Sequence, residues 1–186
     1  MKILILSEYF PSGKDLKFSG GVEARTYYLA KNLAKRHQVH IITSRLPATK
    51  TKEKLSRINI HRVGKIKTYQ ANAHIFSIFS LISFIKEAVK AGSNLSPDIV
   101  DGGNFISHFI AKRIAHKNKI PVVYWYPDVF IGQWIKTSGL ISGFFGWILE
   151  KYNLFTKADC FISISNQTTK KLIKYRISSK IIKTIP

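Results

Sequence analysis

The sequence predicts an α/β fold of the Rossmann type, with a mostly parallel sheet of about seven strands in a three-layer α/β/α arrangement. Short runs of β-branched and apolar residues alternate with longer segments of helical periodicity along the 186 residues, which is typical of repeated βα units. Runs such as Ile3–Leu6 and Val122–Trp125 are apolar throughout, as in strands buried on both faces. With 45% hydrophobic residues the chain can form one core, so we expect a single domain over residues 1–186.

Strands are expected, in chain order, at Lys2–Ser7, Gln38–Thr43, Asn59–Val63, Ile99–Asp101, Pro121–Trp125, Cys160–Ile164 and Lys180–Ile185. Helices are expected at Gly21–Arg36, Ile75–Ala91, Phe105–Asn118, Leu140–Thr156 and Asn166–Tyr175, each with Gly, Asn or Ser near one end as a capping residue. The Lys- and Thr-rich segment Pro47–Ser56 is expected to be an exposed, disordered loop. The ending Ile185–Pro186 follows a strand directly, as at a linker to another domain.

The composition favours a partner that carries phosphate. Thirty Lys and Arg against ten Asp and Glu give a net charge of +20, which attracts nucleic acid, anionic lipid or a nucleotide. The single cysteine, Cys160, excludes an internal disulfide and fits a reducing compartment such as the cytoplasm.

Two stretches are more apolar than a sheet protein requires, Ile75–Ile85 and Leu140–Leu149, and both are shorter than the roughly twenty residues of a membrane span. We expect most of these residues to pack in the core. The alternative is a helix lying on anionic lipid, because lysines flank both stretches. This would place the protein at the inner face of the membrane.

A glycine pair opens the first helix. Gly20 and Gly21 precede a helix start whose free N–H groups attract a phosphate, and glycine lets a ligand approach the backbone closely. Glu23 suits the first helical turn, and Arg25 could reach a phosphate or point into water. An ordinary Gly-Gly turn is the open alternative. The spacing is not that of a dinucleotide fingerprint, and the sequence has no Gly-Lys-Ser/Thr phosphate loop.

These residues resemble family 4 of the glycosyltransferases, which have the GT-B fold. The similarity rests on Leu4–Pro11, on Gly20–Glu23 with the helix that follows, on Pro97–Val100 and on Lys157–Ser165. It implies that the chain is the amino-terminal, acceptor-side half of such an enzyme, and that the carboxyl-terminal, nucleotide-sugar-binding half is absent. The resemblance also implies transfer from a UDP- or GDP-linked sugar with retention and without a metal ion or other cofactor, on a glycan or lipid-linked acceptor. The fragment alone would be inactive.

The resemblance also suggests site residues. It implies that Gly20 and Gly21, with Glu23 and Arg25, lie beside the donor diphosphate. Pro127 stands where the family usually has a His, so Asp128 is the remaining candidate for a catalytic or sugar-binding group, with a turn-forming role as the alternative. The candidates for acceptor contact are Tyr9, Phe10, Asp101, Asn104, Trp125 and Tyr126, and the alternative for Asp101 and Asn104 is again a turn.

Other function classes fit less well. The six histidines show no metal-ligand spacing and are interpreted as surface or packing residues, so no metal site is expected. A stand-alone basic module that binds nucleic acid or anionic membrane is the main alternative, but the sequence has no nucleic-acid-binding signature, so nucleic acid is not the expected partner. A family member that has lost catalysis is a further alternative, because of Pro127.

Overall fold

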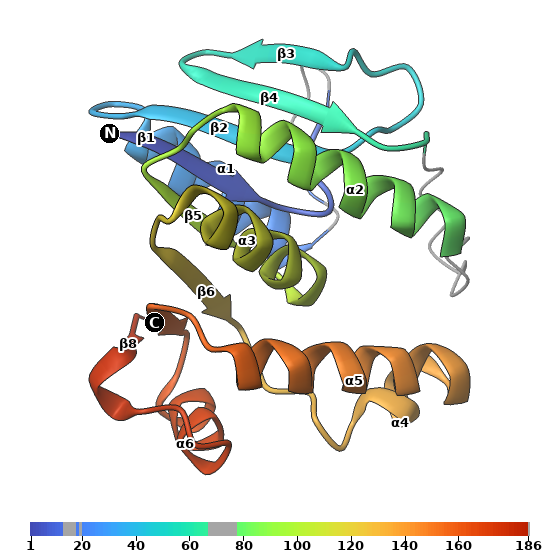
Figure 1. The fold of residues 1–186 in the computed structure, drawn as a ribbon, viewed down its shortest axis with the longest axis vertical. Coiled ribbons are helices and arrows are strands. Elements are labelled where there is room, and N and C mark those ends of the chain that lie inside the picture. Colours follow the sequence, from blue (N-terminus) through green and yellow to red (C-terminus); the bar gives the residue numbers. More distant parts are fainter. Residues whose placement is uncertain (13–17, 19, 67–77, 186) are drawn as a thin grey trace.

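The computed structural model describes residues 1–12, 18, 20–66 and 78–185. Within these ranges the strands are β1 (Lys2–Leu6), β2 (Gln38–Ser44), β3 (Lys52–Leu55), β4 (Ile58–Val63), β5 (Ile99–Gly102), β6 (Val122–Tyr126), β7 (Cys160–Ser163) and β8 (Ile182–Thr184). The helices are α1 (Gly21–Leu33), α2 (Ile78–Asn94), α3 (Phe105–Asn118), α4 (Trp134–Ser138), α5 (Leu140–Thr156) and α6 (Asn166–Lys174), with one 3-10 turn at Ser179–Ile181. Figure 1 shows their arrangement.

The strands form one sheet in the order β3-β4-β2-β1-β5-β6-β7-β8. Every neighbouring pair is parallel except β3 and β4. The chain builds outward from β1 to β2 and β4 on one side, and then crosses back to build β5, β6, β7 and β8 on the other. The order therefore reverses between β1 and β5, which is where open parallel sheets bind ligands, beyond the carboxyl ends of the strands.

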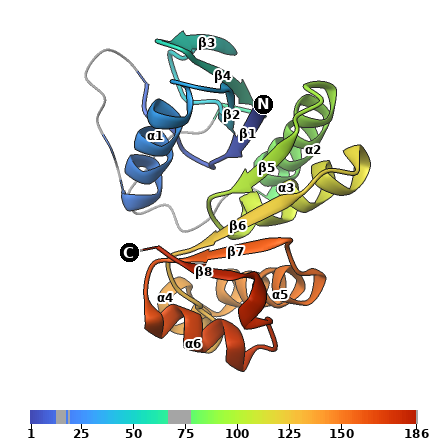
Figure 2. The same ribbon diagram turned by 90° about the vertical axis from the view of Figure 1, so that its left-hand side faces the viewer.

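Helices cover both faces of the sheet, as the three-layer prediction requires (Figure 2). On β1, Leu4 and Leu6 join the core formed with α2, α3 and α5, whereas Ile3 and Ile5 join the core formed with α1. This alternation is the two-residue period of a strand that is buried on both faces.

The predicted strands and helices are present within a few residues of their expected bounds, although the first three residues of the expected helix from Ile75 lie outside the described residues. The expectation for Pro47–Ser56 was wrong in part, because β3 lies inside it. β3 is an edge strand with a charged, barely apolar sequence, so hydrophobic patterning could not reveal it. Its partner β4 supplies the main-chain pairing, and the ion pair between Glu53 and Arg62 adds to it.

Candidate functional site

The candidate site lies at the carboxyl ends of β1 and β5, where the strand order reverses and an open parallel sheet binds ligands. We call this edge the crevice. The chain leaves β1 toward α1 on one face and leaves β5 toward α3 on the other, so the two connections diverge. The Gly103 N–H donates to the Leu6 carbonyl at 3.0 Å and holds the two strand ends together. A Cβ at Gly103 would stand 3.1 Å from that carbonyl oxygen, so glycine allows this close approach.

The glycine pair is exposed at the start of α1. Gly20 is the N-cap, with an extended backbone (φ −172°, ψ 173°), and Gly21 begins the helix. Neither glycine has a positive φ, and no described atom lies within 4 Å of where a Cβ would stand on either one. Neither backbone conformation nor packing among the described residues therefore demands glycine here. Because glycine has no side chain, the pair leaves the N–H groups at the start of α1 accessible.

Arg25 does not extend freely into water. Its Nη1 lies 2.6 Å from Oδ2 of Asp101, on β5, and its guanidinium lies 4.9 Å from the centroid of the Trp125 ring, on β6. Three predicted site residues from three elements thus meet on the face of the sheet that α1 covers. The guanidinium and the carboxylate neutralise each other, and the indole shields one side of the pair.

The other residues expected near the donor or the acceptor differ in burial and in hydrogen bonding. Glu23 is buried in the first turn of α1. Tyr9 is half-buried after β1, and its carbonyl accepts a hydrogen bond from the Ser7 hydroxyl at 2.7 Å. Asn104 caps α3, because its Oδ1 accepts from the Ser107 N–H at 3.0 Å. Capping is the turn role that the sequence left open for Asn104.

Phe10 and Tyr126 are core residues. Phe10 is buried with the residues packed against α1. Tyr126 is buried on the opposite face, where its ring stacks on His108 with centroids 4.7 Å apart. Burial raises the pKa of Tyr126 well above its usual value. Neither side chain reaches solvent at the crevice, so we leave both out of the proposed acceptor surface.

His108 lies on α3 against β6, and the sequence interpretation made it a surface or packing residue. It is fully buried, and its Nε2 donates to the Trp125 carbonyl at 3.1 Å. Burial lowers its pKa to about 3, a shift partly opposed by that carbonyl. The ring is therefore neutral at physiological pH. It supports β6 behind Trp125, which the sequence could not indicate because 17 residues separate the two.

Asp128 is paired rather than isolated. Its Oδ1 lies 2.7 Å from Nζ of Lys171, on α6, and also accepts from the Val129 N–H at 2.7 Å. The neighbouring Pro127 carbonyl accepts from the Thr168 hydroxyl at 3.1 Å. These contacts tie the end of β6 to α6, and the carboxylate stays partly exposed. Nothing in the sequence distinguishes Lys171 from the many other lysines.

Arg62 fixes the segment after β1. It is fully buried and donates from Nη1 to the Phe10 carbonyl at 3.1 Å and from Nη2 to the Pro11 carbonyl at 2.8 Å. Its Nε donates to Oε1 of Glu53 at 2.5 Å. A buried guanidinium that meets two carbonyls and a carboxylate is well satisfied. Through these bonds β3 and β4 position the chain that leads from β1 toward the glycine pair.

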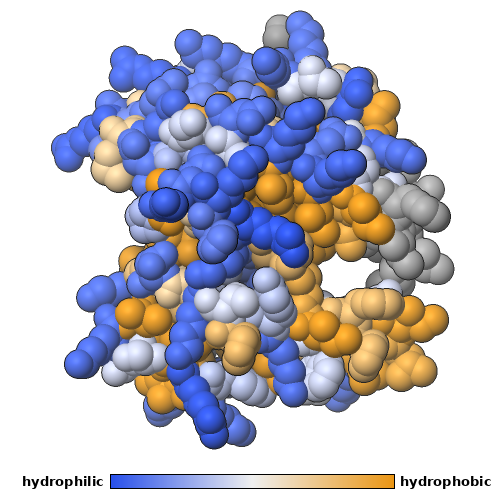
Figure 3. All heavy atoms as spheres, viewed as in Figure 1, coloured by the Kyte–Doolittle hydropathy of each residue, from blue (hydrophilic) through white to orange (hydrophobic). Residues whose placement is uncertain are grey.

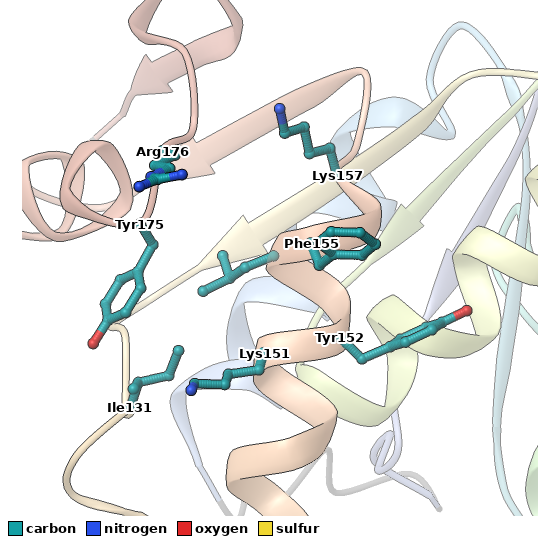
Figure 4. Close-up of a pocket in the computed structure, with 8 residues that line it drawn as sticks. Ile131, Lys151, Tyr152, Phe155, Lys157, Tyr175 and Arg176 are labelled. Carbon is teal, nitrogen blue, oxygen red and sulfur yellow. The ribbon is translucent and has the colours of Figure 1, made fainter.

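A separate open groove of about 650 Å³ lies between the last turns of α5 and the end of α6, away from the crevice (Figure 4). Tyr152, Phe155 and Tyr175 give it apolar walls. The cations Lys151, Lys157 and Arg176 surround it.

Neither a metal site nor a membrane-spanning helix is found among the described residues. In that part of the chain, no three His, Cys, Asp or Glu side chains come together as a metal ion would need. Nor is any helix among residues 1–12, 18, 20–66 and 78–185 both long enough and apolar enough to cross a bilayer.

The family model for "Glycosyltransferase Family 4" matches residues 19–186. The chain belongs to glycosyltransferase family 4. The match includes the glycine pair, the Arg25, Asp101 and Trp125 cluster, and Asp128. No curated protein sequence matches the chain significantly.

Solved structures of sugar-processing enzymes share the fold of this family 4 domain. Sucrose-phosphate synthase from Thermosynechococcus elongatus superposes with a TM-score of 0.74 at 15% identity, over 100% of this chain and 47% of that one. HepE from Anabaena, solved with UDP-glucose, gives 0.62 at 15% identity, over 100% and 43%. The lipopolysaccharide outer core galactosyltransferase WaaB gives 0.58 at 14% identity, over 99% and 45%.

The chain spans less than half the length of these solved structures. A UDP-GlcNAc 2-epimerase from Methanocaldococcus jannaschii has a similar fold, with a TM-score of 0.58 at 12% identity, over 100% of this chain and 45% of that one. The fold is therefore shared by enzymes that transfer sugars and by one that epimerises a nucleotide sugar. The family match, rather than the fold, identifies this chain as a glycosyltransferase domain.

Proposed function

We propose that this chain is the amino-terminal domain of a retaining glycosyltransferase that moves a sugar from a UDP- or GDP-linked donor to a glycan or lipid-linked acceptor. The observation that carries the proposal is the exposed pair Gly20 and Gly21 at the start of α1, at the edge where β1 and β5 end. These glycines are not explained by strain or by packing among the described residues, but they are explained by a ligand that comes close to the backbone.

In the proposed reaction, the glycine pair serves the departing diphosphate. The bond between the anomeric carbon and the diphosphate oxygen breaks, and negative charge develops on that oxygen. Main-chain N–H groups at the start of α1 point toward this charge, and the helix dipole stabilises it without a metal ion. The anomeric carbon forms its new bond to an acceptor hydroxyl, whose proton is released.

The proposed acceptor surface is the cluster of Asp101 and Trp125, with Tyr9 and Asn104 at its margin. The Asp101 carboxylate accepts from Arg25 and keeps lone pairs that a sugar hydroxyl can use. The Trp125 ring is buried beneath the Arg25 guanidinium, so its proposed role is to hold the Arg25 and Asp101 side chains in place for the acceptor. Asp128, one residue after the position where the family has a His, is the proposed group at the reacting sugar, and Lys171 holds its carboxylate in place.

The proposal requires a second domain to bind the nucleotide and most of the donor sugar. The described residues provide one α/β sheet and one crevice, and the similar structures are about twice as long as this chain. HepE was solved with UDP-glucose, which favours a nucleotide sugar as the donor here. We propose that residues 1–186 alone do not transfer sugar, and that the enzyme acts in the cytoplasm, at the inner face of the membrane.

The decisive experiment introduces a carboxylate at the glycine pair of the full-length protein. In Gly21→Asp, the new charge lies in the first helical turn, where the dipole favours it, so stability is retained or slightly raised. It repels the diphosphate, so sugar transfer from radiolabelled UDP- and GDP-sugars should fall about 100-fold or more. The matched control is Asn166→Asp, which places the same carboxylate at the start of α6 and should leave transfer unchanged.

Equal transfer by Gly21→Asp and Asn166→Asp would overturn the proposal. So would salt-dependent binding of random duplex DNA by the full-length protein with no response to any nucleotide sugar, which the stand-alone basic module predicts. Retention is checked by nuclear magnetic resonance of the fresh product, whose anomeric configuration must match that of the donor.

A further inference from the structure

Helix α5 has its apolar side turned outward. Its buried side presents Gly143 and Gly146 to Trp134 and Ile135 of α4, so closely that a Cβ at Gly143 would stand 2.6 Å from the Ile135 Cα. Large apolar side chains occupy the exposed side at a spacing that forms one continuous stripe. We name as the α5 stripe the residues Leu140, Ile141, Phe144, Phe145, Ile148 and Phe155.

The α5 stripe is far from buried. The exposed fractions are 74% for Ile141, 60% for Phe145 and 84% for Phe155. Figure 3 shows hydrophobic surface over α4 and the beginning of α5. A contiguous apolar surface of this kind marks an interaction site.

Polar bonds hold the helix in this orientation. The buried Glu150 accepts from the Trp134 Nε1 at 2.6 Å and from the Phe130 N–H at 2.9 Å. The buried Asn153 donates to the Phe105 carbonyl at 2.8 Å. Turning α5 to bury the α5 stripe would break these bonds, and unpaired buried polar groups are costly. The side of α5 that carries Glu150 and Asn153 must therefore face the protein, and the apolar side faces outward.

The charges beside the α5 stripe are all positive. Across residues 134–157 the charged side chains are Lys136, Glu150, Lys151 and Lys157, and of these only Glu150, the one carboxylate, is buried. The Lys151 Nζ lies 4.1 Å above the Trp147 ring. The groove at the end of α5 adds Arg176. Lysines beside an exposed aromatic helix face match a bilayer with anionic headgroups.

Helix α5 begins near the crevice, so a bilayer bound to α5 would lie close to the proposed site. Because α4 and α5 follow the carboxyl end of β6, α5 begins at the edge of the sheet where the crevice lies (Figure 1). Of the two apolar stretches, the helix α2 buries Phe84 and Ala88 in the core and exposes Ile82. Helix α5 exposes all six residues of the α5 stripe, so it offers lipid the larger apolar surface.

We infer that the α5 stripe and its flanking lysines are a docking surface for an anionic phospholipid bilayer, with α5 lying in the plane of the interface. A second copy of the chain is the less favoured occupant, because it would bring the same lysines together on chains of net charge +20. Docking on lipid requires no nucleotide sugar. It can therefore succeed or fail independently of the proposed sugar transfer.

The test is flotation of the full-length protein with vesicles in the absence of donor. Vesicles of phosphatidylcholine and phosphatidylglycerol in equal parts should carry the protein, and vesicles of phosphatidylcholine alone should carry about tenfold less. The double variant Ile141→Asp/Phe145→Asp should reduce partitioning about 100-fold, because it removes apolar burial and repels the headgroups. Lys136→Glu/Lys151→Glu should reduce it about tenfold and remove most of its salt dependence.

The matched control is Tyr28→Asp on α1, an aromatic residue of 55% exposure on the other face of the sheet. It should float like the unaltered protein, and thermal unfolding should show that every variant is folded. Equal flotation of Tyr28→Asp and the stripe variant would overturn the inference. So would failure of the unaltered full-length protein to float, as expected if another domain covers the α5 stripe, or a dimer that dissociates only in the stripe variant.

Discussion

The Arg25 guanidinium and the Asp101 carboxylate join α1 to β5 across 76 residues of sequence, with Nη1 and Oδ2 2.6 Å apart. Both side chains are mostly buried, and the Trp125 ring lies against the guanidinium. The pair closes the face of the sheet beside the crevice. It therefore links the helix that carries the glycine pair to the strand that carries the proposed acceptor contact.

Removing either member of this pair should cost stability. Asp101→Ala leaves a partly buried cation without its partner, and we expect a loss of about 2 kcal/mol in the free energy of unfolding, between the values for exposed and fully buried pairs. Urea denaturation of Asp101→Ala, Arg25→Ala and the double variant measures the coupling. If the two single losses simply add in the double variant, the ion pair contributes nothing.

Arg62 should be among the most sensitive positions. Arg62→Ala leaves the Phe10 and Pro11 carbonyls and the Glu53 carboxylate without their donor, so we expect a loss of about 3 to 5 kcal/mol. Arg57→Ala, at an exposed position on the same β-hairpin, is the control and should change the free energy of unfolding by less than about 0.5 kcal/mol. Similar denaturation midpoints for the two variants would contradict the assigned role.

Replacement by alanine should cost much more stability at Gly102 than at Gly20. A Cβ at Gly102 would stand 3.1 Å from the Cα and N of His108, and this backbone cannot easily shift, so Gly102→Ala should lose about 2 kcal/mol. Gly20→Ala meets no described atom, so it should lose only the roughly 0.5 to 1 kcal/mol by which alanine is a poorer N-cap than glycine. Thermal unfolding compares them directly. If Gly102→Ala were as stable as Gly20→Ala, the backbone of α3 at His108 could shift at little cost to make room for the new Cβ.

Glu150 should give the protein a measurable pH dependence. Burial raises the pKa of this carboxyl from 4.5 to about 7, although the Trp134 and Phe130 donors oppose the shift. Between these pH values the folded protein holds a proton that the unfolded chain has released. Stability therefore falls as the pH rises through this window, by about 3 kcal/mol in all, and the contribution is constant on either side.

The pH dependence is isolated by comparing the unaltered protein with Glu150→Gln. Burial lowers the pKa of His108 to about 3 and that of His61 to about 4, so these groups destabilise the fold as the pH falls and mask Glu150 in the unaltered protein. The difference between the two unfolding curves should show the Glu150 contribution alone. Parallel curves from pH 4 to pH 8 would exclude a raised pKa.

The sequence by itself was sufficient for seven of the eight described strands and for the prediction that a ligand would bind at their carboxyl edge. Short apolar runs such as Ile3–Leu6, rich in β-branched residues and bounded by polar ones, are typical of strands buried on both faces, and the carboxyl ends of parallel strands share one edge. The glycine pair could be located because a helix start with two missing side chains is a local feature of the chain. The same local reasoning missed β3, whose pairing and ion pair come from β4.

Only the tertiary structure decided which side chains meet. The sequence left open whether the Arg25 side chain contacts a phosphate or points into water, and the structure shows that it pairs with Asp101 on β5. Likewise, Lys171 pairs with Asp128, which lies 43 residues away in the sequence. Helical periodicity showed that α5 has an apolar side, but it could not show that this side faces outward. That was decided by the glycines that fit α4 and by the polar bonds of Glu150 and Asn153. Sequence spacing fixes which residues share a face, whereas long-range packing and hydrogen bonding fix where that face points.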